Sequence, residues 1–426
     1  MRTRALLAVV FTACSGAPSP DEARVPESSA LRVTAARNAL LIVIDTTRAD
    51  ALAAAATPHI DALASSGASV PRAWSAGTWT VPSVISLMTG MSVREHGHDL
   101  STGLLGRYPP LPDAPTLAEV LQAHGFRTWG AHANPYLSEQ LGFDRGFDSW
   151  SRSVDRAIPS QFAEHVRESW RGDGRNFAYV HFIGPHSPVR PSPAASARHG
   201  VDPVLVPPGE GMNIGVAKRD RAGPAREAYR AAYHAVLEDT DTRVGAVIDA
   251  LGEHRAETLI VLTSDHGELL GEHGRVGHGR HVWEALTHVP LIVDHPHVQG
   301  FDEHLPPAVN NTVVPDIVTH GLGLERDWPS RIASPLPLVA QREGRFALSP
   351  DGRRKAIWDA DLSNEAQLFD LESDPMEGAP RPDTDGIMAA ERVEFEIGHP
   401  PGTAHDGTVT LHPETVQRLQ ALGYLP

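Results

Sequence analysis

A series of unbroken apolar runs, each followed by polar residues, constrains the fold of this chain most strongly. NALLIVIDTT (38–47) is nearly continuous, and TLIVLTSD (258–265) leads straight into an aspartate. Two further runs, RTWGAHAN (127–134) and FAYVHFIGPHSP (177–188), end in histidines and an asparagine. A run without polar alternation predicts a strand that is buried on both faces, as in a parallel sheet.

Amphipathic helix patterns separate these runs. In TPHIDALASSG (57–67), Thr57 is a plausible N-cap, Pro58 occupies the first helical position and Gly67 ends the pattern. The longest pattern, residues 227–252, repeats apolar residues at three- and four-residue steps. Strands that alternate with helices predict an α/β fold with a mostly parallel sheet between helices.

Polar side chains stand where three of the predicted strands end. Asp45 follows the first run, His186 the third, and Asp265 with His266 the last. Each residue alone is also consistent with a cap, a turn or a solvated loop. In open α/β sheets, however, ligands bind outside the carboxyl ends of the strands, which would gather these side chains in one crevice. Carboxylates and imidazoles together suit one divalent cation, and the set does not distinguish Ca, Mg, Mn and Zn.

The stretch GTWTVPSVISLMTG (77–90) reads as a turn that leads into a short helix. Pro82 falls in the first turn and Gly90 just beyond the end. Thr80 would then lie at the helix start, where backbone N–H groups point outward and favour anions.

Composition narrows the possible partners. The 426 residues are 41% apolar and 21% charged, which is typical of a globular protein, and the formal net charge is −16. A nucleic-acid backbone would be repelled over most of such a surface, so no nucleic-acid partner is expected.

The N-terminus has the features of an export signal. MRTRALLAVVFTACSGAPSP begins with basic residues, continues with a short apolar run, and contains the only cysteine, Cys14. The string FTAC resembles a bacterial lipoprotein signal, which predicts a periplasmic or outer-membrane lipoprotein whose only membrane contact is a lipid on Cys14. A plain secretory signal is the alternative. Residues 15–36 read as a tether, so residues 1–36 lie outside the predicted fold.

The motifs resemble the sulfatase family of the alkaline phosphatase superfamily over most of residues 38–426. LIVIDTTRADAL is similar to the first metal-binding strand, and TVPSVISLMTG aligns without a gap with the nucleophile motif. GPHSP is similar to the Pro-His loop, and LTSDHGELLGEHGRVGHG to the second metal strand and its histidine loop. LFDLESDPMEG and the terminal LHPETVQRLQALGYLP resemble the C-terminal part of bacterial members.

The resemblance implies an alkaline phosphatase-like α/β fold, a catalytic domain at 37–330 and a smaller α+β subdomain at 331–426. It also implies roles for particular residues. The metal ligands would be Asp45, Thr80, Asp265 and His266, with Thr80 also the nucleophile. His186 and His278 would lie near the ester, and His273 belongs to the same loop.

Four positions depart from the family pattern. Sulfatases convert Cys or Ser at the nucleophile position to formylglycine, whereas Thr80 is not a substrate for that conversion. Val84 replaces the motif arginine, Met91 replaces a basic residue, and Thr46 stands where many sulfatases carry a second aspartate. Threonine nucleophiles do occur in the superfamily, in lipoteichoic acid synthases and phosphoethanolamine transferases.

These observations predict a metal-dependent hydrolase without formylglycine, acting on an anionic ester, either a sulfate ester or a phosphodiester. With Thr46 in place of an aspartate, one cation is expected, and a monoanionic group should suit the site better than a dianionic phosphate monoester. A phospho-group transferase of the same fold and a catalytically inactive binding protein are the alternatives. Residues 187–224 either shape the substrate pocket or form a surface excursion.

Overall fold

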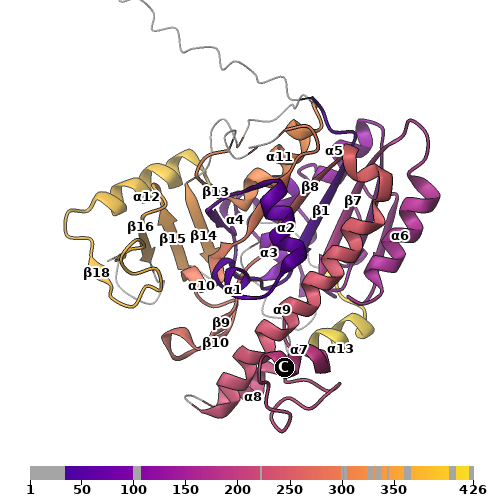
Figure 1. Cartoon of the computed structure of the whole chain (residues 1–426). Coiled ribbons are helices and arrows are strands. Elements are labelled where there is room, and N and C mark those ends of the chain that lie inside the picture. Colours follow the sequence, from indigo (N-terminus) through magenta and orange to yellow (C-terminus); the bar gives the residue numbers. More distant parts are fainter. Residues whose placement is uncertain are drawn as a thin grey trace, which may run out of the picture. The chain divides into compact units, whose positions relative to one another are not determined.

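The computed structural model describes residues 34–98, 107–220, 223–298, 301, 305–324, 331, 337–342, 345–358, 366–402 and 409–421. Residues from Thr34 onward form one compact unit. Its centre is a seven-stranded sheet in the order β2-β12-β8-β1-β7-β5-β6 (Figure 1). The five strands from β8 to β6 are parallel, whereas β12 is antiparallel to both of its neighbours. In sheet order the strands are Ala68–Ser69, Leu291–Asp294, Thr258–Thr263, Asn38–Ile44, Arg175–Phe182, Phe126–His132 and Ser149–Arg152.

Side chains alternate between two cores along the central strand β1. Leu41 and Val43 belong to the core shared with α3, α5 and α11. Leu40 and Ile42 belong to the opposite core, shared with α2, α6 and α9. This alternation follows from the two-residue period of a strand, and burial on both faces explains the unbroken apolar run. These helices span Thr80–Thr89, Leu117–Ala123, Val314–Gly321, Pro58–Ser66, Ile158–Ser169 and Pro224–Ala250.

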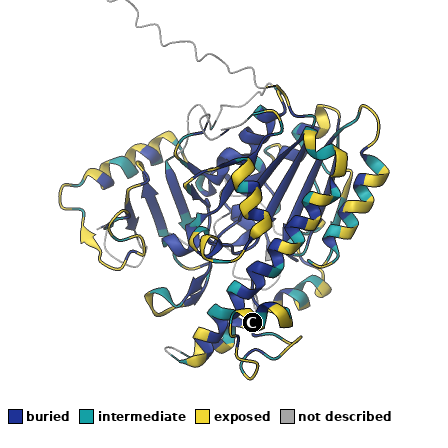
Figure 2. Cartoon of the chain, viewed as in Figure 1, coloured by how far each residue is buried: buried dark blue, intermediate teal, exposed yellow. Residues whose placement is uncertain are grey.

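Figure 2 shows how far each residue in this arrangement is buried. The inner strands of the central sheet are buried, the edge strand β6 is partly exposed, and the covering helices expose their outer faces. The long helix α9 has its tyrosines Tyr229 and Tyr233 fully buried, as the apolar stripe of its sequence predicts.

A second, antiparallel sheet follows the central sheet in the sequence. Its strands β14 to β18 span Leu338–Arg342, Arg345–Ser349, Arg354–Trp358, Gln367–Asp370 and Arg381–Pro382. Lys355 of this sheet is completely buried, with its ammonium 2.9 Å from Glu284 and 2.8 Å from Glu377. The same ammonium lies 4.5 Å from the ring centroid of Trp74, so a buried ionic cluster joins this sheet to the preceding fold.

The shorter elements complete the description. The helices are α1 Ala49–Ala54, α4 Val93–His96, α7 Pro193–Arg198, α8 Ile214–Arg219, α10 Glu284–Thr287, α12 Ile387–Gly398 and α13 Pro413–Ala421. The strands are β3 Arg72–Trp74, β4 Arg107–Tyr108, β9 Leu269–Leu270, β10 Val276–Gly277, β11 His288–Val289, β13 Ala308–Asn310 and β19 Val409–Thr410. Short 3-10 helices span Glu139–Leu141, Gly252–Glu257, Glu272–Gly274 and Asn311–Val313.

The predicted α/β class is confirmed, as are several predicted boundaries. Thr57 precedes α2, which begins at Pro58, and Gly67 ends it. The segment 187–224 is not structureless, because it contains α7 and α8. The division near residue 331 stays a prediction, and the signal, Cys14 and most of the tether lie outside the described residues. Among the helices that the structure describes, none has the length and apolar character needed to cross a bilayer.

Candidate active site

The site lies where neighbouring parallel strands end. Val43 of β1 is opposite both His181 of β7 and Thr263 of β8, so residues just beyond these positions reach the same edge of the sheet. Asp45 follows β1 and Asp265 follows β8, and both are completely buried. This is the arrangement that the crevice rule for parallel sheets predicts.

Four buried polar atoms converge there without hydrogen-bond partners among the described residues. They are Asp45 Oδ1, Asp265 Oδ2, His181 Nε2 and His266 Nε2. His266 Nε2 lies 3.6 Å from Asp45 Oδ1 and 3.6 Å from Asp265 Oδ2, and His181 Nε2 lies 3.7 Å from Asp45 Oδ2. These separations are too long for good hydrogen bonds. Two ligands about 2.0–2.2 Å from one cation stand roughly 3–4 Å apart, so the donor set fits a divalent metal.

Hydrogen bonds elsewhere on the imidazoles set their donor atoms. His266 Nδ1 lies 2.9 Å from the carbonyl oxygen of Gly267, which can only accept, so Nδ1 carries the proton. In the neutral ring, Nε2 then presents its lone pair to Asp45 and Asp265, the form that binds metals. His181 Nδ1 lies 2.8 Å from the hydroxyl of Tyr179, a group that either donates or accepts. His181 can therefore face Asp45 as a donor or act as a metal ligand.

Thr80 begins helix α3 and is completely buried. The amide of Asn134 holds its hydroxyl, because Asn134 Nδ2 donates to Thr80 Oγ1 over 3.1 Å and to Asp45 Oδ2 over 2.6 Å. The orientation of this amide is fixed by its other end, since Asn134 Oδ1 accepts the backbone N–H of Tyr136 over 2.9 Å. Thr80 is thus tied to the metal-site carboxylate, and α3 ends at Gly90 with a φ of 72°, as its sequence predicts.

Two histidines, His186 and His278, border this group. The rings of His186 and His278 have centroids 5.0 Å apart, and those of His266 and His278 are 4.5 Å apart. His278 Nδ1 lies 3.3 Å from both carboxylate oxygens of Glu268, a fully buried residue. His186 Nδ1 donates to the carbonyl of Ser187. Both rings therefore have one nitrogen oriented by a neighbour.

Burial and crowding shape the ionisation of the site. Burial opposes ionisation of Asp45, but the adjacent His181, together with His186 and His266, holds its pKa below the usual range. Burial and the nearby Asp45 raise the pKa of Asp265. Burial lowers the pKa of His186 to about 4 and raises that of Glu268 to about 7. The negative charges of Asp45 and Asp265 repel each other here, and a bound cation would reduce this repulsion.

Thr46 does not direct its side chain into the donor set. Its hydroxyl donates over 2.8 Å to the carbonyl of Asp45, and its backbone N–H donates over 3.2 Å to Asp265 Oδ1. Its φ is 54°, a left-handed conformation that is strained for a β-branched residue. The backbone at this position therefore orients Asp265, while the side chain adds no ligand.

Val84 leaves its position without a charge, but the structure places a cation near Thr80 that the sequence did not reveal. Val84 is completely buried in the apolar core and brings no charge to the site. Arg342 of β14 instead reaches this region from the C-terminal sheet. Its guanidinium lies 4.8 Å from the ring centroid of Trp79, the residue before Thr80, and its Nε donates over 2.6 Å to the carbonyl of Gly279.

His273 lies apart from the buried group. It is exposed, has a φ of 52° and stacks on Trp283 with a ring-centroid separation of 3.8 Å. The structure therefore brings together Asp45, Thr80, Asp265, His266, His186 and His278, and places His273 at the rim of a neighbouring cleft. Sequence reasoning missed His181, Asn134, Glu268 and Arg342. For His181 and Asn134 the available signal was a polar residue near the end of a predicted strand, as for Asp45.

Comparison with known proteins decides the family. The family described as Sulfatase matches residues 37–314, more than half of the chain. The chain belongs to the sulfatase family. A choline-sulfatase of Rhizobium meliloti (strain 1021) is 33% identical over 180 residues, 35% of this chain and 32% of that protein. An ulvan-active sulfatase of Formosa agariphila is 26% identical and covers 63% of this chain and 56% of its own length. The chain thus spans between a third and about half of these curated relatives.

Solved structures confirm the sulfatase fold. A structure described as a complex with D-glucosamine-2-N,6-O-disulfate, its substrate, has a TM-score of 0.65 at 16% identity, covering 86% of this chain and 99% of that one. A phosphonate monoester hydrolase from Silicibacter pomeroyi has a TM-score of 0.63 at 20% identity, covering 88% and 99%. At these identities the likeness establishes the fold.

Proposed function

We propose that this sulfatase-family chain is an exported, metal-dependent hydrolase that cleaves a sulfate ester or a phosphodiester with Thr80 as nucleophile. The observation that carries this proposal is the joint position of Thr80 and the convergent donors. Asn134 bonds the Thr80 hydroxyl and Asp45 at once, and Asp45 faces the unsatisfied atoms of His266 and His181. The named activities of the relatives, on sulfate and phosphonate esters, support the same class of chemistry.

Asp45, Asp265, His266 and Thr80 would hold the cation. When bound, a divalent cation supplies Lewis-acid stabilisation of the Thr80 alkoxide and of the ester oxygens. The hydrogen bond from Asn134 fixes the direction in which the Thr80 oxygen points. Because Thr80 begins a helix, backbone N–H groups point outward beside it and favour the negative charge of the ester.

The reaction proceeds in two displacements. In the first, Thr80 Oγ1 forms a bond to sulfur or phosphorus, the bond to the alcohol oxygen breaks, and the hydroxyl proton ends on the departing alcohol. In the second, water breaks the Thr80 ester, which restores the threonine and releases the acid. His186 and His278, each held through one ring nitrogen, transfer the protons.

The experiment is an ester screen on the purified chain with metal content measured in parallel. Substrates are 4-nitrophenyl sulfate, bis(4-nitrophenyl) phosphate and 4-nitrophenyl phosphate, assayed at pH 8 so that the ordinary histidine is neutral. We expect kcat/KM to be lowest for the phosphate monoester, because a dianion is harder to neutralise beside two carboxylates. A best rate on the phosphate monoester, or two cations per chain, would contradict the one-cation site.

The transferase alternative is separated in the same assay. The threonine at position 80 favours it, because phospho-group transferases of this superfamily use that residue. If release of 4-nitrophenol requires an added acceptor alcohol, the chain is a transferase, whereas release in water alone supports the hydrolase. Failure to retain any divalent metal would favour the inactive binding protein.

A further inference from the structure

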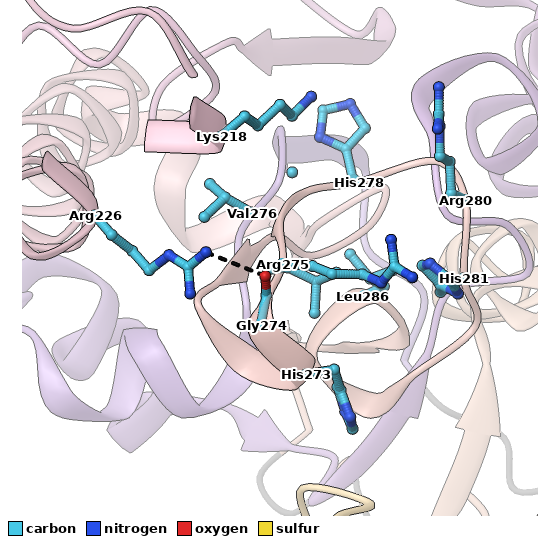
Figure 3. Close-up of a pocket in the computed structure, with 12 residues that line it drawn as sticks. Lys218, Arg226, His273, Gly274, Arg275, Val276, His278, Arg280, His281 and Leu286 are labelled. Atoms are coloured by element: carbon cyan, nitrogen blue, oxygen red, sulfur yellow. Dashed lines mark hydrogen bonds between the residues drawn. The ribbon is translucent and has the colours of Figure 1, made fainter. Parts of the chain in front are cut away.

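A basic cleft of about 530 Å³ opens beside His278. Its lining comes mainly from the loop after β9 and from the ends of α8 and α9 that face this loop (Figure 3). The charged and titratable members of the lining are Lys218, Arg226, Arg275, Arg280, His273, His278 and His281. No carboxylate is among the described lining residues. This concentration of positive charge stands against a net charge of −16 for the whole chain.

Among the exposed cations of this cleft, Lys218 interacts electrostatically with the buried Glu268, but none forms a close ion pair with a described residue. In the described part of the chain, Lys218, Arg275 and Arg280 make no ion pair within 4.0 Å. Like charges gathered without a close counter-charge repel one another, which costs folding free energy. An anion bound in the cleft would relieve this repulsion, so the arrangement favours an anionic ligand.

Arg226 gives independent evidence for such an anion. Only 8% of its surface is exposed, and its Nη2 donates over 3.1 Å to the carbonyl of Gly274. Its Nε is buried without a hydrogen-bond partner among the described residues. A buried guanidinium that contacts one neutral carbonyl and no carboxylate is costly unless a ligand completes its bonding.

The cleft meets the candidate active site at His278. This residue lines the cleft, and its ring centroid is 4.5 Å from that of His266. The Lys218 side chain packs against Gly277, the residue before His278, because a Cβ placed on Gly277 would lie 2.8 Å from Lys218 Cε. In Figure 3 the Lys218 ammonium extends toward His278, and Arg226 reaches Gly274 from the other side. The remainder of an ester bound at Thr80 would thus enter the cleft past His278.

From this geometry we propose that the cleft binds a second anionic group of the substrate. The substrate is then a polyanion, carrying at least one sulfate, phosphate or carboxylate group in addition to the ester that is cleaved. That the bound group belongs to a substrate rests on the proposed function, whereas binding of an oxyanion in the cleft does not. Lys218 and Arg275 act as specificity-determining residues that contact the second anionic group.

The first test measures binding without turnover. Sucrose octasulfate is titrated calorimetrically into the Thr80→Ala chain, with sucrose and inorganic sulfate as comparisons. The double variant Lys218→Gln/Arg275→Gln, made in the Thr80→Ala background, should weaken octasulfate binding about tenfold or more, because two charged contacts to the sulfate groups are lost. Arg190→Gln/Arg219→Gln removes the same charge from exposed arginines outside the cleft and should leave the affinity nearly unchanged. If octasulfate affinity falls equally in both double variants, or falls in neither, the cleft is not the binding site and the proposal is wrong.

The second test asks whether the cleft belongs to the substrate. Octasulfate should inhibit hydrolysis of 4-nitrophenyl sulfate competitively, and inhibition should weaken in Lys218→Gln/Arg275→Gln but not in the control. Purely non-competitive inhibition would show that the bound anion is not part of the substrate. A chain that binds octasulfate through these cations but cleaves no ester would retain the oxyanion site and reject the hydrolase. A chain that cleaves esters but does not bind octasulfate would support the hydrolase and reject the oxyanion site.

Discussion

Asn134 donates a hydrogen bond from Nδ2 to Oγ1 of Thr80 over 3.1 Å, and this contact sets the direction of the Thr80 oxygen. Since the same nitrogen contacts Asp45, the amide couples the hydroxyl to the donor set. Replacing Asn134 by Ala should lower kcat about 10- to 100-fold because the hydroxyl loses its orientation. Metal content should persist, because no donor atom is removed. Metal loss that parallels the loss of kcat would instead make Asn134 part of the binding set.

Thr80→Ala should abolish turnover while leaving the melting temperature nearly unchanged, since only a small buried hydroxyl and methyl are removed. Thr80→Ser should retain part of the rate, because it keeps the attacking oxygen. Intact-mass and peptide mass spectrometry should find unmodified threonine at position 80, including in chain produced beside a formylglycine-generating enzyme. Substantial activity in Thr80→Ala would exclude the hydroxyl as nucleophile.

Asp265→Asn should lose metal and activity together, because a carboxylate both ligates the cation and offsets its charge. His181→Gln tests a residue that the sequence did not single out. If His181 is a ligand, metal affinity should fall about 10- to 100-fold, the range usual for metal-site partners. Metal bound per chain is measured by inductively coupled plasma mass spectrometry after dialysis. Full metal content in Asp265→Asn would eliminate this site.

Thr46→Asp adds a carboxylate beside Asp265 at a position whose φ of 54° an aspartate tolerates better than threonine. We expect tighter metal binding in competition with a chelator and, because of the added negative charge, a higher KM for anionic esters. Thr46→Ser keeps the hydroxyl that bonds the Asp45 carbonyl and should leave both quantities unchanged. Unaltered metal affinity in Thr46→Asp would mean that this position cannot reach the donor set.

Glu377 makes a pH dependence of stability testable away from the metal site. Burial raises its pKa to about 7, against the opposing attraction of Lys355. The folded chain therefore holds a proton that the unfolded chain releases near pH 4.5. The resulting stabilisation is fully present below that pH and is lost as pH rises through 7.

Glu377→Gln should remove this component, since glutamine does not titrate. Urea unfolding at pH 5 to 8 should show the free energy of unfolding of the wild type falling relative to that of the variant by on the order of 1–3 kcal/mol. A constant difference between the two chains across this range would show that Glu377 is ionised throughout.

Much of the fold could be predicted from local patterns. The apolar run before Asp45 and the helix boundaries at Thr57 and Gly67 depend on nearest neighbours in the sequence, so their signals survive without tertiary information, although the Thr57 side chain makes no capping hydrogen bond. The strand-end rule also predicted that Asp45 and Asp265 would meet, because parallel strands end at a common edge.

Contacts between distant segments could not be predicted in the same way. His181 lies inside an apolar run and reads as a strand residue until its register against Val43 is known. Arg342 belongs to a strand more than 250 residues after Trp79. Most of the basic residues of the cleft come from the stretch 273–281, but only the fold brings Lys218 of α8 and Arg226 of α9 against it.

Arg342 has a consequence for how the protein is made. A ribosome completes every strand of the central sheet before it reaches residue 342, yet the loop carrying His278 still lacks the guanidinium that bonds Gly279. The nascent chain can therefore form its main sheet early while the loop beside Thr80 remains without this anchor. Competence for catalysis would then arrive with the last fifth of the polypeptide, late in synthesis.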